Sequence, residues 1–213
     1  MSNKPFLIGI TGGSGSGKTT IARTLFEILS PDCTNISEDD YYKDTSKMEG
    51  FGQANFDYDN PIIRDHEILY DDLLLFSQGK EINQPLYDFV NHCRFEHTKK
   101  INPTRFLVIE GTHVLHNAQI RELLDLKIYI HTDEETRFKR RLERDVKERG
   151  RSVESVHTQY NLIVKPGHYK WTEPTKEFAD LILYCNDDPK VCEDIRLKQN
   201  VDLIVAHIKK QTE

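Results

Sequence analysis

The sequence has few features of a membrane, disulfide-bonded or nucleic-acid-binding protein. Its apolar runs, such as 6–10 and 123–130, are too short or too interrupted to cross a bilayer, and no apolar stretch of signal-peptide length follows the first residues. The four cysteines lack C-x-x-C spacing, which favours free thiols. The net charge of −6 argues against broad binding to nucleic acid or membrane surfaces. We therefore expect a cytoplasmic protein with small-molecule partners, and neither nucleic-acid nor membrane partners.

Short β-branched runs alternate with helical patterns along the 213 residues, which is typical of a parallel sheet with crossover helices. Strands are expected at 6–10, 34–37, 106–110, 126–131 and 180–184. Helices are expected at 17–29, 62–76 and 191–208. A further helix is expected to begin at a capping box formed by residues 132–135. The pattern predicts an α/β fold, a doubly wound parallel sheet in a single domain 1–213. A small β-hairpin insertion is expected at about 80–102, and a helical lid at about 137–165.

The segment from residue 12 to 19, GGSGSGKT, matches the phosphate-binding pattern G-x-x-x-x-G-K-[ST]. Glycines let main-chain N–H groups approach phosphate oxygens, Lys18 would place a cation on the β- and γ-phosphates, and Thr19 would offer its hydroxyl to Mg²⁺. An apolar strand enters the loop and a helical pattern leaves it, so the positive helix end would face the same anion. This P-loop predicts a nucleotide-binding set of Gly12, Gly13, Ser14, Gly15, Ser16, Gly17, Lys18, Thr19 and Thr20.

Acidic residues follow two of the predicted strands, at the carboxyl edge where ligands bind in open α/β sheets. Glu110 ends the apolar run 106–109, and Gly111 after it would permit close approach of a ligand. Asp39 and Asp40 follow the strand 34–37, which the common doubly wound order would put beside the P-loop strand. We expect Thr19, Glu110 and Asp39 near Mg²⁺. Either Asp39 or Asp40 could be a solvated loop acid, but the two tyrosines that follow them favour a pocket of carboxylates and aromatic rings.

P-loop proteins include motors, GTPase switches and small-molecule kinases. The Asn-Lys-x-Asp guanine motif is missing, since the dipeptide at 3–4 precedes the P-loop and lacks the Asp. A kinase needs an acid near the acceptor hydroxyl and cations over the migrating charge. Residues 137–151 supply eight Lys or Arg against three acids. The chemistry therefore favours a kinase.

The basic segment has the spacing of a lid helix. Arg137, Arg141 and Arg144 would share one helical face, and an adjacent apolar stripe would hold Phe138, Leu142 and Val146. A cationic stripe beside an apolar one suits a lid that closes over phosphates. The alternative is a solvated face stabilised by i,i+4 pairs, which explains the excess of positive charge poorly.

Several segments in order resemble the uridine kinase (uridine–cytidine kinase) family, from residue 6 to about 183. They are the P-loop at 9–19, EDDYYK at 38–43, NFD at 55–57, QPLYDFVNH at 84–92, the basic segment 140–151, QY at 159–160 and KP at 165–166. The resemblance implies a P-loop NTPase-type kinase that transfers the γ-phosphoryl of ATP or GTP to the 5′-hydroxyl of uridine or cytidine, giving UMP or CMP in pyrimidine salvage. It also implies Mg²⁺ as cofactor and a homo-oligomer, a tetramer.

The resemblance assigns roles to matched positions. Asp39 would accept the proton of the 5′-hydroxyl, while Lys18, Arg144 and Arg149 would stabilise the transferring phosphoryl group. The substrate-binding residues would be Tyr42, Phe56, Asp57, Tyr87, Phe89, His92, Arg141, Arg151 and Gln159. Within that set, Asp57 and Arg141 would hold the ribose hydroxyls, and the aromatic side chains would enclose the ring. His92 and Arg151 would read the pyrimidine edge.

Two segments depart from the family pattern. Thr112-His113 replace apolar residues after Glu110-Gly111, and Tyr184-Cys185-Asn186 replace a Pro-Arg-Gly near the expected adenine surroundings. The donor therefore stays open between ATP and GTP. Two alternative functions also stay open: a related kinase acting on ribulose 5-phosphate, as phosphoribulokinase does, and a non-catalytic nucleotide-binding regulator. The presence of Asp39 counts against the regulator.

Overall fold

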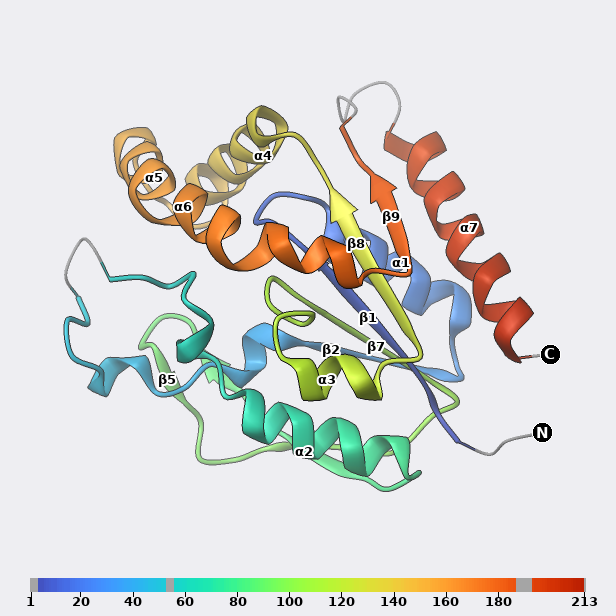
Figure 1. Ribbon diagram of the computed structural model, residues 1–213. Coiled ribbons are helices and arrows are strands. Elements are labelled where there is room, and N and C mark those ends of the chain that lie inside the picture. Colours follow the sequence, from blue (N-terminus) through green and yellow to red (C-terminus); the bar gives the residue numbers. More distant parts are fainter. Residues whose placement is uncertain (1–3, 53–55, 187–192, 213) are drawn as a thin grey trace.

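A five-stranded parallel sheet forms the centre of the computed structural model, which describes residues 4–52, 56–186 and 193–212 (Figure 1). The strand order is β2-β7-β1-β8-β9, and every neighbouring pair is parallel. The strands are β1 (Phe6–Gly12), β2 (Cys33–Ser37), β7 (Phe106–Gly111), β8 (Leu126–His131) and β9 (Leu181–Tyr184). The five predicted strands are all present, and the predicted α/β fold is confirmed.

The predicted position of β2 beside the P-loop strand is wrong. β7 lies between β1 and β2, and its residue Glu110 is opposite Ile10 on one side and Ser37 on the other. β7 is buried along its whole length, because strands flank it on both sides and helices cover both faces of the sheet. The carboxyl edge therefore presents the P-loop, Glu110 and the end of β2 in that order.

The two sheet faces are covered by different helices. α1 (Lys18–Leu29) and α7 (Glu193–Thr212) pack on one face, and α2 (His66–Ser77) and α3 (Ala118–Leu123) on the other (Figure 1). Alternate side chains of β1 serve the two layers: Ile8 and Ile10 join the first core cluster and Leu7 joins the second. Burying each such side chain contributes about 1.5–3 kcal/mol. The predicted start of the closing helix, Val191, lies outside the described residues.

α2 begins four residues later than predicted. Pro61–Ile63 forms a 3-10 turn, Arg64 is extended and bridges to Tyr42, and the Asp65 side chain caps α2 by accepting from the Ile68 amide. The apolar residues of the 3-10 turn continue the helical pattern in sequence, which is why the prediction extended the helix through them.

The insertion between α2 and β7 holds two short antiparallel ladders. β3 (Ile82–Gln84) pairs with β6 (Lys99–Ile101), and β4 (Tyr87–Asp88) pairs with β5 (Cys93–Arg94). Tyr87 of the β4–β5 ladder packs against the segment that follows β2, and its hydroxyl lies 2.7 Å from the Thr45 hydroxyl. The insertion thus contacts the segment that contains Asp39 and Asp40.

Helices also lie beyond the carboxyl ends of the strands. They are α4 (Glu134–Lys147), α5 (Val153–Gln159) and α6 (Lys165–Gly167), and helical turns continue from α6 to Phe178 (Figure 1). The sequence predicted no element for 166–178, where Pro166, Gly167 and Pro174 read as helix breakers. In the described part of the chain no helix is both long and apolar enough to cross a membrane.

Candidate active site

The P-loop links the end of β1 to the start of α1 at Lys18. Gly15 and Gly17 have φ of +79° and +94°, a region that side-chain-bearing residues rarely adopt. A Cβ on Gly15 would also collide with the Arg137 carbonyl oxygen, and one on Gly13 would lie 2.6 Å from Arg137 Nη1. Glycine at 15 is therefore required both by backbone conformation and by the close approach of α4.

The start of α4 is tied to the P-loop instead of being closed by the predicted capping box. The Thr132 hydroxyl donates to the Ser16 carbonyl (3.0 Å), and Arg137 Nε donates to the Thr132 carbonyl (3.1 Å). Asp133 precedes the first turn of α4 without a side-chain capping bond. The capping-box prediction is wrong because the Thr132 hydroxyl is used to hold the P-loop main chain.

The Glu110 carboxylate, at the carboxyl edge of the sheet, is surrounded by polar side chains. Ser37 Oγ donates to Glu110 Oε1 (3.3 Å), and the Thr19 hydroxyl also bonds to this carboxylate. Burial raises the pKa of Glu110, the positive charge of Lys18 opposes that rise, and the nearby Asp39 carboxylate adds to it. Four predicted site residues, Lys18, Thr19, Asp39 and Glu110, are therefore neighbours.

Gly111 was predicted to permit the close approach of a ligand, and this prediction is wrong. A Cβ on Gly111 would collide with the Glu38 carboxylate, so a protein side chain and not a ligand approaches it. Glu38 is fully buried and accepts from the His113 amide (2.9 Å) and pairs with His66 Nε2 (2.8 Å). Burial would raise the pKa of Glu38, but the His66 hydrogen bond and the Arg64 charge outweigh it and lower the pKa to about 2. The group is a buried anion beneath the site.

The two aspartates after β2 have different surroundings. The Asp39 side chain is 50% exposed, and its Oδ1 accepts from Arg64 (3.4 Å). Asp40 Oδ2 accepts from Gln84 Nε2 (2.6 Å), and burial together with the Asp39 charge raises the pKa of Asp40 to about 6. The Asp39 carboxylate is therefore open to solvent, whereas that of Asp40 is engaged by the insertion.

Aromatic residues next to Asp39 form two linked groups. The rings of Tyr42, Tyr87 and Phe89 lie within 6.3 Å of one another, centroid to centroid. Phe56 and His92 belong to a second group, in which Tyr58 lies 4.7 Å from Phe56 and 5.4 Å from His92. The Tyr42 hydroxyl donates to the Tyr58 carbonyl (3.3 Å), which joins the groups.

The arginines of the predicted lid segment surround one carboxylate. Asp145 is fully buried, and guanidinium nitrogens of Arg141, Arg144, Arg149 and Arg151 lie 3.0–3.7 Å from its oxygens. Arg141 also donates to Ser14 Oγ of the P-loop (2.8 Å), and both Arg141 and Arg151 donate to Gln159 Oε1 (3.1 and 2.5 Å). These interactions join α4 and α5 to the phosphate loop.

α4 buries two of the three arginines that were predicted to share one face. Its buried residues are Arg137, Arg141 and Asp145, while the expected apolar stripe is only partly buried. α4 lies over the carboxyl edge of the sheet and not on the hydrophobic core, so its inward face is charged. Phe138 packs instead on Tyr160 of the following helical segment (4.7 Å between centroids).

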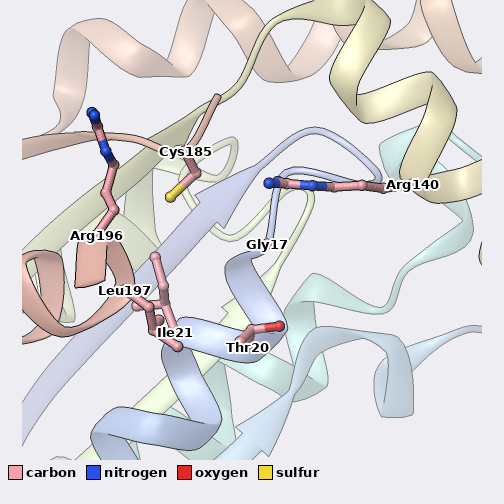
Figure 2. A pocket seen from close by; sticks show the side chains of 7 residues that line it. All are labelled: Gly17, Thr20, Ile21, Arg140, Cys185, Arg196 and Leu197. Atoms are coloured by element: carbon pink, nitrogen blue, oxygen red, sulfur yellow. The ribbon is translucent and has the colours of Figure 1, made fainter. Parts of the chain in front are cut away.

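A pocket of about 390 Å³, open to solvent, adjoins the P-loop (Figure 2). Gly17, Thr20 and Ile21 form its α1 side, and Arg140 extends over the loop from α4. Cys185, which follows β9, and Arg196 and Leu197 of α7 complete the lining. Cys185, from the departure at 184–186, therefore borders a pocket beside the phosphate loop.

The phosphoribulokinase / uridine kinase family model matches residues 7–191. The chain belongs to this family. A uridine kinase from Clostridium perfringens is 44% identical over 97% of this chain and 96% of its own length, and one from Ligilactobacillus salivarius is 39% identical over 95% of each chain.

Solved structures at lower identity share the fold. A phosphoribulokinase from Rhodobacter spheroides has a TM-score of 0.62 at 16% identity, covering 86% of this chain and 71% of its own. A possible uridine kinase from Bacillus stearothermophilus has a TM-score of 0.61 at 18% identity, covering 85% and 90%.

Thr112 and His113, which depart from the uridine kinase pattern, both make contacts within the protein. His113 is fully buried, and its Nε2 lies 2.8 Å from the Asp59 carbonyl. Burial and the Arg64 charge lower the pKa of His113 to about 3, so the ring is neutral. The Thr112 carbonyl accepts from the Thr11 hydroxyl (2.9 Å). His113 thus ties the loop around Asp59 to the end of β7, and Thr112 ties the same end to β1.

Sequence reasoning missed several residues of this family member's site. Arg64 contacts Asp39 and Tyr42, Asp145 organises the lid, and Tyr58 joins the ring groups. Asp145 was visible as an acid four residues after Arg141. No pattern in the sequence indicated that Arg64 is buried.

Proposed function

We propose that this protein is a kinase that transfers the γ-phosphoryl group of ATP to the 5′-hydroxyl of uridine or cytidine. The observation that carries the proposal is the gathering of Lys18, Thr19, Glu110 and Asp39 at one sheet edge, next to an aromatic group that begins with Tyr42. The first four suit phosphoryl transfer to a hydroxyl, and aromatic rings suit a flat base. The uridine kinases among its relatives support the choice of acceptor.

The donor would bind along the P-loop. Residues 12–20 would cradle its phosphates, Lys18 would neutralise the β- and γ-oxygens, and the pocket between Gly17 and Leu197 would take its base. The guanidinium of Arg140 at the pocket rim suits stacking on an aromatic base. Kinases of this family imply ATP as donor, and GTP enters the test below as a second donor.

The side chains at the carboxyl edge of the sheet offer the kind of ligand atoms that Mg²⁺ needs. The Thr19 hydroxyl and the carboxylates of Glu110 and Asp39 are oxygen donors, the type that Mg²⁺ prefers, and a kinase site completes its coordination with phosphates and water. When bound, the ion would neutralise charge on the β- and γ-phosphates.

Asp39 would accept the proton of the 5′-hydroxyl. The hydroxyl oxygen then bonds to the γ-phosphorus while the bond from that phosphorus to the β–γ bridging oxygen breaks, and ADP leaves. Arg144 and Arg149 would neutralise charge on the transferring group. The placement of Arg149 supports this, because the Asp39 charge is among those that act on its guanidinium.

The acceptor would lie among the remaining predicted residues. Tyr42, Phe56, Tyr87 and Phe89 would enclose it, with Asp57 and Arg141 at the ribose and with His92, Arg151 and Gln159 near the base. The bonds from both Arg141 and Arg151 to Gln159 support a shared role for these three. Assembly as a homo-oligomer and cytoplasmic location stay predictions.

The test measures ADP formed from Mg-ATP, or GDP formed from Mg-GTP, with a panel of uridine, cytidine, adenosine, ribulose 5-phosphate and pantothenate. We expect turnover with uridine or cytidine, and little with the other acceptors. Turnover that does not respond to either pyrimidine nucleoside would refute the proposal, and preference for ribulose 5-phosphate would assign the related kinase activity. Glu143→Gln, an exposed change on α4, is the matched control for protein quality.

A further inference from the structure

Arg64 is a buried guanidinium that the scheme above does not use. It is only 4% exposed and occupies the extended residue between the 3-10 turn and α2, where its backbone bridges to Tyr42. Burying a charge is costly unless it is paired and hydrogen-bonded. An arginine here therefore requires partners, and they lie on the acceptor side of the site.

The guanidinium touches both the proposed base and the ring beside it. Nη2 donates to Tyr42 Oη (2.7 Å) and to Asp39 Oδ1 (3.4 Å). Nη1 donates to the Tyr58 carbonyl (3.3 Å), and Cζ lies 4.4 Å from the centre of the Tyr42 ring. Burial raises the pKa of Tyr42, so its hydroxyl stays protonated and donates to Tyr58 while it accepts from Arg64.

A second arginine serves the same segment differently. Arg94 donates to the main-chain carbonyls of Tyr41 and Tyr42 and to the Asp65 carboxylate. Two of its three bonds hold the backbone of that segment, whereas two of the three bonds of Arg64 hold the functional ends of side chains. Arg64 also lies 3.6 Å from Glu38 through Nε, so it links the buried anion to the exposed one.

We propose that Arg64 is a positioning residue of the acceptor site: it fixes the Asp39 carboxylate and the Tyr42 ring relative to each other. The inference rests on the proposed role of Asp39 as proton acceptor. With 4% exposure Arg64 acts through these two side chains and not by contact with the reacting atoms. A lysine would replace it only in part, because one ammonium group lacks the planar fork that reaches several acceptors at once.

The experiment compares Arg64→Lys and Arg64→Met with wild type and with Arg94→Lys. Steady-state kinetics with uridine and ATP give kcat and both KM values, titration calorimetry gives ATP affinity, and thermal unfolding gives Tm. We expect Arg64→Met to lower kcat/KM for uridine by about 10², since a misplacement of about 1 Å can cost that factor. ATP affinity should change less than about twofold, and Arg64→Lys should recover only part of the loss.

Tyr42→Phe completes a double-mutant cycle, because it removes the hydroxyl that Arg64 binds and keeps the ring. If Arg64 acts partly through that hydroxyl, the losses in Arg64→Met and Tyr42→Phe combine less than additively. If Arg64→Met does not fold, Arg64→Lys carries the test, with an expected loss of about tenfold in kcat at unchanged ATP affinity.

The contrary outcomes are distinct. Arg64 variants that lose Tm but keep kcat and KM for uridine, or lose donor and acceptor affinity equally, assign a structural role only. If Arg94→Lys lowers kcat/KM for uridine as much as the Arg64 variants do, the inference is overturned as well. Wild-type protein that phosphorylates no nucleoside refutes the proposed function, and the inference falls with it.

Discussion

Asp145 is the carboxylate around which the lid arginines gather, and removing its charge should loosen the lid. Its Oδ1 lies 3.0 Å from Arg144 Nη2 and 3.3 Å from Arg149 Nη1, and its Oδ2 lies 3.4 Å from Arg141 Nε. Asp145→Asn keeps the shape but turns an NH₂ donor towards guanidinium donors. Four positive charges would then face one another without a counter-charge.

The expected loss follows from the burial of each partner. Breaking a buried ion pair costs about 3–5 kcal/mol, and Arg141, with 10% exposure, is the partner in that environment. The side chains of Arg144, Arg149 and Arg151 are 28–55% exposed. Solvent screens these three, and they add about 0–1 kcal/mol each. For a chain of this size, about 3 kcal/mol lowers Tm by roughly 10 °C.

Urea unfolding of Asp145→Asn beside Glu143→Gln measures this directly, since Glu143 is an exposed acid on the same helix. We expect a loss of about 3 kcal/mol or more for Asp145→Asn and less than about 0.5 kcal/mol for the control. Equal stability of the two variants would refute the reasoning that Asp145 holds the arginines. We also expect kcat to fall, because Arg144 and Arg149 lose their common anchor.

Three further predictions follow from the site. Lys18→Ala should lower kcat by roughly 10² or more with an unchanged circular dichroism spectrum, and near-wild-type kcat would contradict its role at the phosphates. Gly15→Ala should lower Tm and ATP affinity, because φ of +79° and the Arg137 carbonyl leave no room for a Cβ; calorimetry that finds wild-type affinity would argue against this. The pKa of Glu38 is held at about 2, below its unfolded value, so its stabilisation is complete above pH 4.5 and disappears as the pH falls towards 2. Unfolding free energies at pH 5 and pH 3 should therefore differ less in Glu38→Gln than in wild type.

Much of the fold was predictable from local sequence. The five predicted segments became the five strands, most clearly 6–10, 106–110 and 126–131, which are apolar and β-branched. The strand order was not predictable, since nothing in residues 33–37 indicates that β7 and not β1 is their neighbour. The boundary of α2 was missed for a similar reason: the 3-10 turn at Pro61–Ile63 is held by the Asn60 side chain, a contact that the apolar pattern does not reveal.

The site was predictable where residue type alone implies chemistry. The P-loop and Glu110 were found from a motif and from a strand end, and the structure brings Lys18, Thr19, Glu110 and Asp39 together. Asp145 and Arg64 could not be found this way. Their importance depends on the burial of charge between elements far apart in sequence, and a charged residue on a helical pattern reads as solvated until its neighbours are known.

Transfer to the 5′-hydroxyl is the central claim, and phosphorus NMR of the product tests it most directly. With Mg-ATP and uridine, wild-type protein should give a single 5′-monophosphate, 5′-deoxyuridine should give no phosphorylated product, and Asp39→Asn should form UMP about 10² times more slowly. Phosphate on the 2′- or 3′-oxygen, turnover of 5′-deoxyuridine, or an undiminished rate in Asp39→Asn would contradict the account.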